Sequence, residues 1–254
     1  MLDKKNLIHV AVEKNQIPQF LFKYHSQNFL DDLFINNELW FSSPLSFNDP
    51  FDCQINLNTE NTVEEIEDFF SGFPVRNKER RLIAEEFIQD PEKWHQLMNK
   101  SAKEAINSNG VCCFSKKEDN LLLWSHYGDS HKGVCLKFDI LEDPEFFYFP
   151  SNVKYKQKYP VYNHIKNRDE ILNSLMLTKA EAWSYEEEFR IIKMSKLGGQ
   201  KIAKTSIVEI IFGCRCSQDF IEKIISLTKA FGYNLIYKKA VINKSNFNLD
   251  FEII

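Results

Sequence analysis

The sequence predicts an α+β fold: a single domain over residues 1–254 with a mixed, mostly antiparallel sheet, flanking helices and a helical insertion at about 60–108. In the second half of the chain strand patterns outnumber helix patterns, and they do not alternate with helices as a parallel βαβ fold would require. A chain of 254 residues is long enough to bury a large core, and neither an internal repeat nor a low-complexity linker divides it.

The segment from 60 to 108 is charged and has a helical pattern. Thr62 and Glu65 have the spacing of a capping box, and Asp90 before Pro91 is typical of a helix start with proline at the first position. This insertion either covers one end of the sheet or forms a small lid.

The other elements follow from alternation of apolar residues, from turn residues and from helical spacing. One predicted helix is capped by Ser26 and has apolar residues at positions 29, 30, 33 and 34. The others are a short apolar helix within 120–127, a helix at about 169–181 and one at 217–231, the last ended by Gly232. The predicted strands lie at 39–42, 111–114, 133–138, 153–155, 189–193 and 207–212, with a weaker candidate at 234–237.

Composition narrows the function classes. The net charge of -4 gives no general attraction to nucleic acid or to an anionic membrane, although a local basic patch is compatible with it. No apolar run approaches the length of a transmembrane helix, so no membrane partner is expected. The six cysteines lack the spacing of a zinc site and no signal peptide precedes them, so we expect a cytoplasmic protein without a bound metal.

The most informative segment is 183–192, which combines aromatic residues, carboxylates and a guanidinium. If it is extended from Tyr185 onward, alternation places Glu186, Glu188 and Arg190 on one face. Two carboxylates beside an arginine can hold a ribose and stabilise a developing cation. The same residues could equally form a surface ion-pair ladder of little energetic value.

The turn-rich loop at 41–52 concentrates polar groups after a strand, where binding residues are often found. Its candidates are Ser42, Ser43, Asn48 and Asp49, although Asn and Asp also satisfy their own backbone in ordinary turns.

A second group of candidates follows the strand that ends at Ser115. A short apolar helix presents Trp124, His126 and Tyr127 together, and histidine suits proton transfer near neutral pH. The alternative is a histidine held by a structural hydrogen bond.

Two further segments carry positive charge. Lys23 and Tyr24 could grip a phosphate-bearing ligand or simply end a strand. Lys154, Lys156 and Lys158 alternate with aromatic and amide residues, which fits contact with phosphate or single-stranded nucleic acid, and fits a lysine-protected edge strand equally well.

These motifs together resemble a bacterial family catalogued as domain of unknown function 2971. The resemblance follows the family's order over residues 21–193. It is carried by Lys23 and Tyr24, by 39–42 with Pro44 and 47–52, by 113–115, by 123–127 with 131–135, and by 183–190.

The layout of that family looks like that of ADP-ribosyltransferase-type domains, which carry a late strand with a Glu-x-Glu pair. The resemblance implies that Glu188 is the catalytic carboxylate and that Glu186 assists it. His126, singled out above by its chemistry, is a further catalytic candidate. The ligand-binding residues expected alongside them are Lys23, Tyr24, Ser42, Ser43, Asn48, Asp49, Ser115, Trp124, Tyr127 and Arg190.

The expected function is therefore NAD-dependent ADP-ribosyl transfer, with NAD as the substrate and a macromolecule or nucleotide as the acceptor. A toxin or anti-phage effector is one setting for such an activity, and an antitoxin or defence-operon partner would accompany it. Two alternatives stay open: a nuclease or phosphoryl-transfer enzyme that uses His126, and a non-catalytic module that senses a nucleotide.

Overall fold

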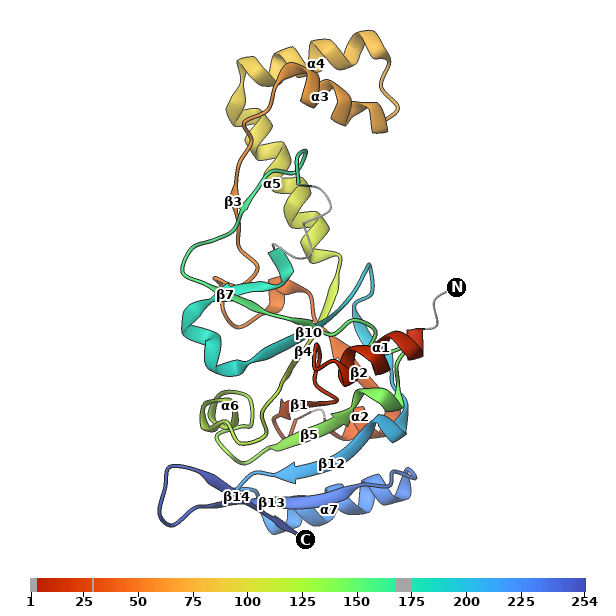
Figure 1. Cartoon of the computed structure of the whole chain (residues 1–254), viewed down its shortest axis with the longest axis vertical. Coiled ribbons are helices and arrows are strands. Elements are labelled where there is room, and N and C mark those ends of the chain that lie inside the picture. The colour runs from red at the N-terminus through yellow and green to blue at the C-terminus, as the bar shows by residue number, and fades with distance from the viewer. Residues whose placement is uncertain (1–3, 29, 168–174) are drawn as a thin grey trace.

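The computed structural model describes residues 4–28, 30–167 and 175–254. Its centre is an eight-stranded sheet with the strand order β14-β13-β12-β5-β1-β4-β10-β6, in which β12 and β13 are parallel and the other neighbours are antiparallel (Figure 1). The sheet strands are β1 (Phe20–His25), β4 (Gly110–Ser115), β5 (Val134–Asp139), β6 (Ser151–Asn152), β10 (Glu188–Lys193), β12 (Ile207–Phe212), β13 (Ile236–Ile242) and β14 (Leu249–Ile253). The predicted α+β class with a mostly antiparallel sheet is confirmed.

Three two-stranded ribbons lie beside this sheet. They pair β2 (Glu38–Phe41) with β11 (Gly198–Lys201), β3 (Asn56–Leu57) with β8 (Val161–Tyr162), and β7 (Lys154–Lys156) with β9 (Thr178–Ala180).

Helices cover both faces of the sheet. On one face the largest apolar cluster joins α1 (Lys4–Glu13), α2 (Leu30–Asn36) and α7 (Gln218–Ala230) to the strands through residues such as Ile8, Phe34 and Ile224. On the other face α6 (Leu121–His126) packs Leu123 and Trp124 against Phe22 and Tyr24 of β1. Because neighbouring residues of a strand point to opposite faces, β1 contributes to both clusters.

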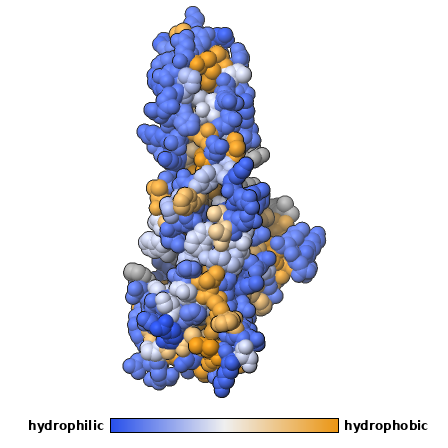
Figure 2. Space-filling view, turned by 90° about the vertical axis from the view of Figure 1, so that its left-hand side faces the viewer, coloured by the Kyte–Doolittle hydropathy of each residue, from blue (hydrophilic) through white to orange (hydrophobic). Residues whose placement is uncertain are grey.

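The helical insertion stands away from the sheet as an arm, at the top of Figure 1. It consists of α3 (Val63–Phe69), α4 (Asn77–Gln89) and α5 (Pro91–Asn107), and its core contains Trp94, Phe87 and Met98. Most of its surface is hydrophilic on the face in Figure 2, where hydrophobic residues gather in a band down the lower half of the molecule. The arm therefore has a small core of its own.

Short 3₁₀ turns complete the described chain at η1 (Pro44–Ser46), η2 (Phe70–Gly72), η3 (Ile140–Glu142), η6 (Glu181–Glu186) and η7 (Lys204–Ser206). None of the helices within the described ranges is long and apolar enough to cross a bilayer.

Two predicted elements need correction. The helix expected at 169–181 falls partly on 168–174, outside the described residues, but Thr178–Ala180 is strand β9 and a 3₁₀ turn follows it. The weak strand expected at 234–237 is the longer β13, whose partner β14 was not predicted.

The capping box of α3 gives a direct test of the arm. The Thr62 side chain accepts a hydrogen bond from the Glu65 amide at 3.2 Å, and Glu65 Oε2 accepts one from the Thr62 amide at 3.0 Å. We expect Thr62→Ala to lower the free energy of unfolding by about 1 kcal/mol, because the Glu65 amide at the helix start is left without its acceptor. Urea denaturation measures this, with the exposed Thr205→Ala as the matched control; equal midpoints for the two variants would contradict it.

Candidate functional site

A cavity of about 420 Å³ opens where β1, β4 and β10 meet the loop after β2. This volume falls within the usual range for small-molecule sites. Aromatic, polar and charged side chains from distant parts of the chain line it, among them Phe22, Lys23, Tyr24, Trp40, Ser42, Phe47, Asn48, Asp52, Cys113, Ser115, His126, Tyr127, Lys179, Glu186, Glu188 and Arg190.

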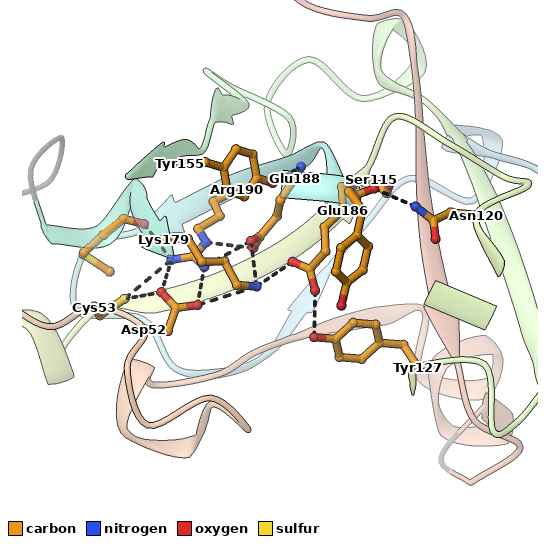
Figure 3. A network of polar contacts seen from close by, with 12 residues as sticks. Asp52, Cys53, Ser115, Asn120, Tyr127, Tyr155, Lys179, Glu186, Glu188 and Arg190 are labelled. Atoms are coloured by element: carbon orange, nitrogen blue, oxygen red, sulfur yellow. Dashed lines mark hydrogen bonds and ion pairs between the residues drawn. The ribbon is translucent and has the colours of Figure 1, made fainter. Parts of the chain in front are cut away.

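The guanidinium of Arg190 is hydrogen-bonded to two of the carboxylates that line this cavity (Figure 3). Its Nε and Nη2 donate to the two oxygens of Glu188 at 2.7 and 3.1 Å, and Nη1 and Nη2 donate to the two oxygens of Asp52 at 3.1 and 2.6 Å. Nη1 also donates to the Met176 carbonyl at 2.8 Å. Because these bonds occupy all five N–H groups of a side chain that is 1% exposed, Arg190 positions the carboxylates and has no donor left for a ligand.

The ammonium of Lys179 lies at the centre of the same carboxylates. Its Nζ is 2.5 Å from Glu186 Oε2, 3.3 Å from Glu188 Oε2 and 3.8 Å from Asp52 Oδ2. Burial would lower the pKa of Lys179, but the nearby Glu188 and Glu186 charges outweigh it and raise the pKa above its ordinary value. Lys179 is therefore a fixed positive charge that holds three carboxylates together.

The two glutamates reach this lysine by a turn, and the expected extended strand from Tyr185 is not formed. Glu186 ends the 3₁₀ turn η6, Glu187 has a left-handed backbone with φ of 43°, and Glu188 begins β10. The left-handed residue turns the chain so that Glu186 and Glu188 both face Lys179, while the Glu187 side chain pairs with Lys117 at 2.7 Å. Glu188 and Arg190 do share a strand face, as alternation predicts.

Hydrogen bonds to the backbone fix this turn from the neighbouring strand and helix. Ser115 Oγ donates to the Glu186 carbonyl at 2.7 Å, and the Asn120 side chain donates to the Tyr185 carbonyl at 2.6 Å. The hydroxyl of Tyr155, in β7, accepts a hydrogen bond from the Glu188 amide at 2.9 Å. The carboxylate pair is therefore held in one arrangement before any ligand binds.

The pKa values of the two glutamates move in opposite directions. Burial would raise the pKa of Glu188, but the charges of Arg190 and Lys179 lower it to about 2, so Glu188 stays ionised. Burial raises the pKa of Glu186; Lys179 opposes this and the like charge of Glu188 adds to it. Two neighbouring carboxyl groups whose pKa values are pushed apart are the usual arrangement of an anion beside a proton carrier.

Tyr127 faces the open side of Glu186. Its hydroxyl donates to Glu186 Oε1 at 2.9 Å, and burial together with the Glu186 charge raises the pKa of Tyr127. His126 is exposed at the cavity wall, with its ring 6.2 Å from that of Trp183.

The cavity brings together most of the residues that the sequence singled out. Lys23 lies in its wall and donates to the Cys113 carbonyl at 3.0 Å, which leaves two of its N–H groups for other partners. The Tyr24 ring lines the cavity while its hydroxyl donates to the Lys117 carbonyl at 2.8 Å. Ser42, Asn48, Ser115, His126 and Tyr127 line the cavity as well.

Three predicted ligand-binding residues do not line this cavity. Ser43 caps η1 and bonds the Asn107 carbonyl, and Asp49 accepts the Phe51 amide in a local turn. Trp124 is fully buried, donates to the Glu118 carbonyl and supports the Tyr24 ring edge-on at 5.2 Å. These three positions stabilise the loops and the core around the cavity.

Sequence reasoning assigned no role to Asp52, Lys179 or Tyr155. Asp52 lies at the end of a turn-rich loop in which acidic residues commonly satisfy their own backbone, and Lys179 lies in a segment whose pattern predicts a helix. The one available signal was a lysine two residues after the apolar run 175–177, since an unpaired lysine is rarely placed among core residues. Within the described residues, no three His, Cys, Asp or Glu side chains are arranged to hold a metal ion.

The segment from α6 to β10 carries Tyr127, Lys179, Glu186, Glu188 and Arg190. Residues 123–191 match the family described as "Protein of unknown function (DUF2971)". The match supports the family resemblance seen in the sequence and assigns no activity. Among curated proteins nothing matches the chain, and no solved structure matches it either.

Proposed function

We propose that this protein is an ADP-ribosyltransferase-like enzyme that takes NAD as its substrate and transfers ADP-ribose to an acceptor. One observation carries the proposal: Glu186 and Glu188 line a single cavity with pKa values displaced in opposite directions. Glycosyl transfer through a cation-like transition state needs an ionised carboxylate and a neighbouring proton acceptor.

The cluster also has the right charge for this chemistry. Three buried carboxylates (Asp52, Glu186 and Glu188) face two buried cations (Lys179 and Arg190), so the fully ionised cluster carries one net negative charge. A preorganised negative charge in a water-poor site favours positive charge that develops nearby.

In the proposed reaction the bond between ribose C1′ and the nicotinamide nitrogen breaks, and its electron pair leaves with nicotinamide. The ionised Glu188 stabilises the positive charge on the ribose. An acceptor oxygen or nitrogen forms the new bond to C1′, and its proton passes to Glu186. The free N–H groups of Lys23 suit a phosphate oxygen, and Tyr24 and Phe47 offer rings for the nucleotide.

The two alternative functions, a nuclease or phosphoryl-transfer enzyme and a nucleotide-sensing module, would use the same cavity. A nuclease or phosphoryl-transfer enzyme would depend on His126, which lines the cavity near Tyr127. A nucleotide-sensing module would bind NAD without turnover. An antitoxin or defence-operon partner and a cytoplasmic location remain part of the proposal for a toxin or anti-phage effector.

The test is the release of nicotinamide and the appearance of label from adenine-labelled NAD in product. We expect Glu186→Gln to lower the rate at least about a hundred-fold, because it removes the proton acceptor and keeps the hydrogen-bonding shape. The exposed Glu181→Gln, which changes the same charge at the start of η6, should retain the wild-type rate.

Three other results would remove the transferase proposal. Equal rates in Glu186→Gln and wild type would exclude the proposed role of the carboxylate. Binding of NAD with thermal stabilisation but no turnover by wild type would favour the sensing module. Cleavage of RNA or DNA that is lost in His126→Ala would favour the nuclease.

A further inference from the structure

A second cavity, of about 660 Å³, lies beside the candidate site between the β7–β9 and β3–β8 ribbons. We call it the lysine groove. The described residues that line it are Phe51, Gln54, Ile55, Asn56, Lys156, Gln157, Lys158, Tyr159, Pro160, Val161, Thr178, Lys179 and Ala180.

The lysine groove adjoins the first cavity through shared residues. Lys179 lines both, and Phe51 in the groove directly precedes Asp52 in the carboxylate cluster. A ligand that lies along the groove would therefore pass next to the proposed site of transfer.

The groove has the charge of an anion-binding surface. Lys156 and Lys158 line the groove and are exposed, and across the described ranges neither is in an ion pair. The described lining contains no Asp or Glu, although the whole chain has 36 acidic residues against 32 basic ones. A lysine-rich groove free of carboxylates is a local exception in an acidic protein.

Exposed aromatic rings accompany these lysines. Phe51 is 63% exposed and Tyr159 is 46% exposed, and in the described part of the chain neither ring packs against another aromatic ring. The amides of Gln54, Asn56 and Gln157 lie between them. Open rings beside unpaired lysines suit bases that stack and phosphates that follow a backbone.

We propose that the lysine groove binds a single-stranded nucleic acid and presents it to the cavity as the acceptor. Duplex bases are already stacked and cannot use the rings of Phe51 and Tyr159, so the groove favours an unpaired strand. The binding stands on the groove alone; the acceptor role rests on the proposed function, in which a hydroxyl or amine of the strand bonds to ribose C1′ and gives its proton to Glu186.

Fluorescence anisotropy with labelled 12-nucleotide RNA and DNA of one sequence tests the proposal, without NAD, so that binding is measured apart from transfer. We expect at least one of the two single strands to bind more tightly than a 12-base-pair duplex of the same sequence. The double variant K156A/K158A should bind more weakly, and its log–log salt slope should fall by roughly 0.7 for each phosphate that the variant no longer neutralises. Phe51→Ala should weaken binding roughly 5- to 150-fold with the slope unchanged.

The matched control is K78A/K100A, which removes the same charge from exposed lysines of the arm and should bind as wild type does. Equal weakening in the two double variants, or a duplex bound as tightly as the single strands, would overturn the proposal. Strand binding without any transfer from NAD would remove the proposed function and leave the groove as a nucleic-acid site. Transfer of ADP-ribose from NAD without strand binding would remove the nucleic-acid site and leave the proposed function.

Discussion

Replacement of Arg190 by methionine is expected to lower the free energy of unfolding by roughly 3 to 5 kcal/mol, the usual result of removing one partner from a buried ion pair. Arg190 forms two-point contacts with both Glu188 and Asp52, and these carboxylates are 4% and 6% exposed. Without the guanidinium, Lys179 alone would face three buried carboxylates. Denaturant unfolding followed by circular dichroism measures the destabilisation.

Two further variants separate charge from packing. Arg76→Met removes an arginine whose side chain is 86% exposed in its pair with Glu79, and should change stability by less than about 0.5 kcal/mol. Arg190→Lys keeps the charge but cannot contact two carboxylates bidentately, so it should fall between Arg190→Met and wild type. A destabilisation below about 1 kcal/mol in Arg190→Met would show that the cluster does not need its guanidinium.

Acid should destabilise the protein through Glu188. The folded-state pKa of Glu188 is about 2, below its ordinary value of 4.5, so its contribution is fully present above pH 4.5 and is lost as pH falls from 4.5 toward 2. The gap between the two pKa values corresponds to roughly 3 kcal/mol. Glu186, with a raised pKa, acts with the opposite sign and opposes folding when it is ionised.

Unfolding free energies measured from pH 7 to pH 2 in wild type and Glu188→Gln isolate this effect, because other carboxylates contribute to both curves. The difference between the curves should shrink as pH falls from 4.5 to 2. Glu186→Gln should keep the steep acid destabilisation, since its Glu188 is still paired with Arg190. Parallel curves for wild type and Glu188→Gln would assign the acid sensitivity to other groups.

Local patterns predicted much of the fold because they report local physics. Alternation located the buried strands at 111–114, 133–138 and 207–212, and the capping residues Thr62 and Asp90 begin helices as expected. The C-terminal strand β14 was missed because only Leu249 of its five residues is buried, which leaves little alternation to detect.

The candidate site was harder to predict because one of its contacts is long-range and another depends on a turn that the sequence pattern does not show. Arg190 meets Asp52 across 138 positions, and Lys179 meets Glu186 only after the chain reverses between β9 and β10. A short window cannot reveal the Asp52 contact, and the Lys179 contact depends on a turn between β9 and β10 in a segment where the sequence pattern predicts a helix. Glu186 and Glu188 were identified from their spacing, but the alternation used to align them does not operate at Glu186.

The left-handed backbone at Glu187 makes the site sensitive to insertions and deletions between its two acids. Glu187 is the one residue between the two acids, and its left-handed backbone sets how their side chains are placed relative to each other. Insertion of a single alanine after Glu187 is expected to move Glu186 or Glu188 away from Lys179, although every original residue is still present in the sequence. Length at this point is therefore as much a determinant of the site as the identity of its carboxylates.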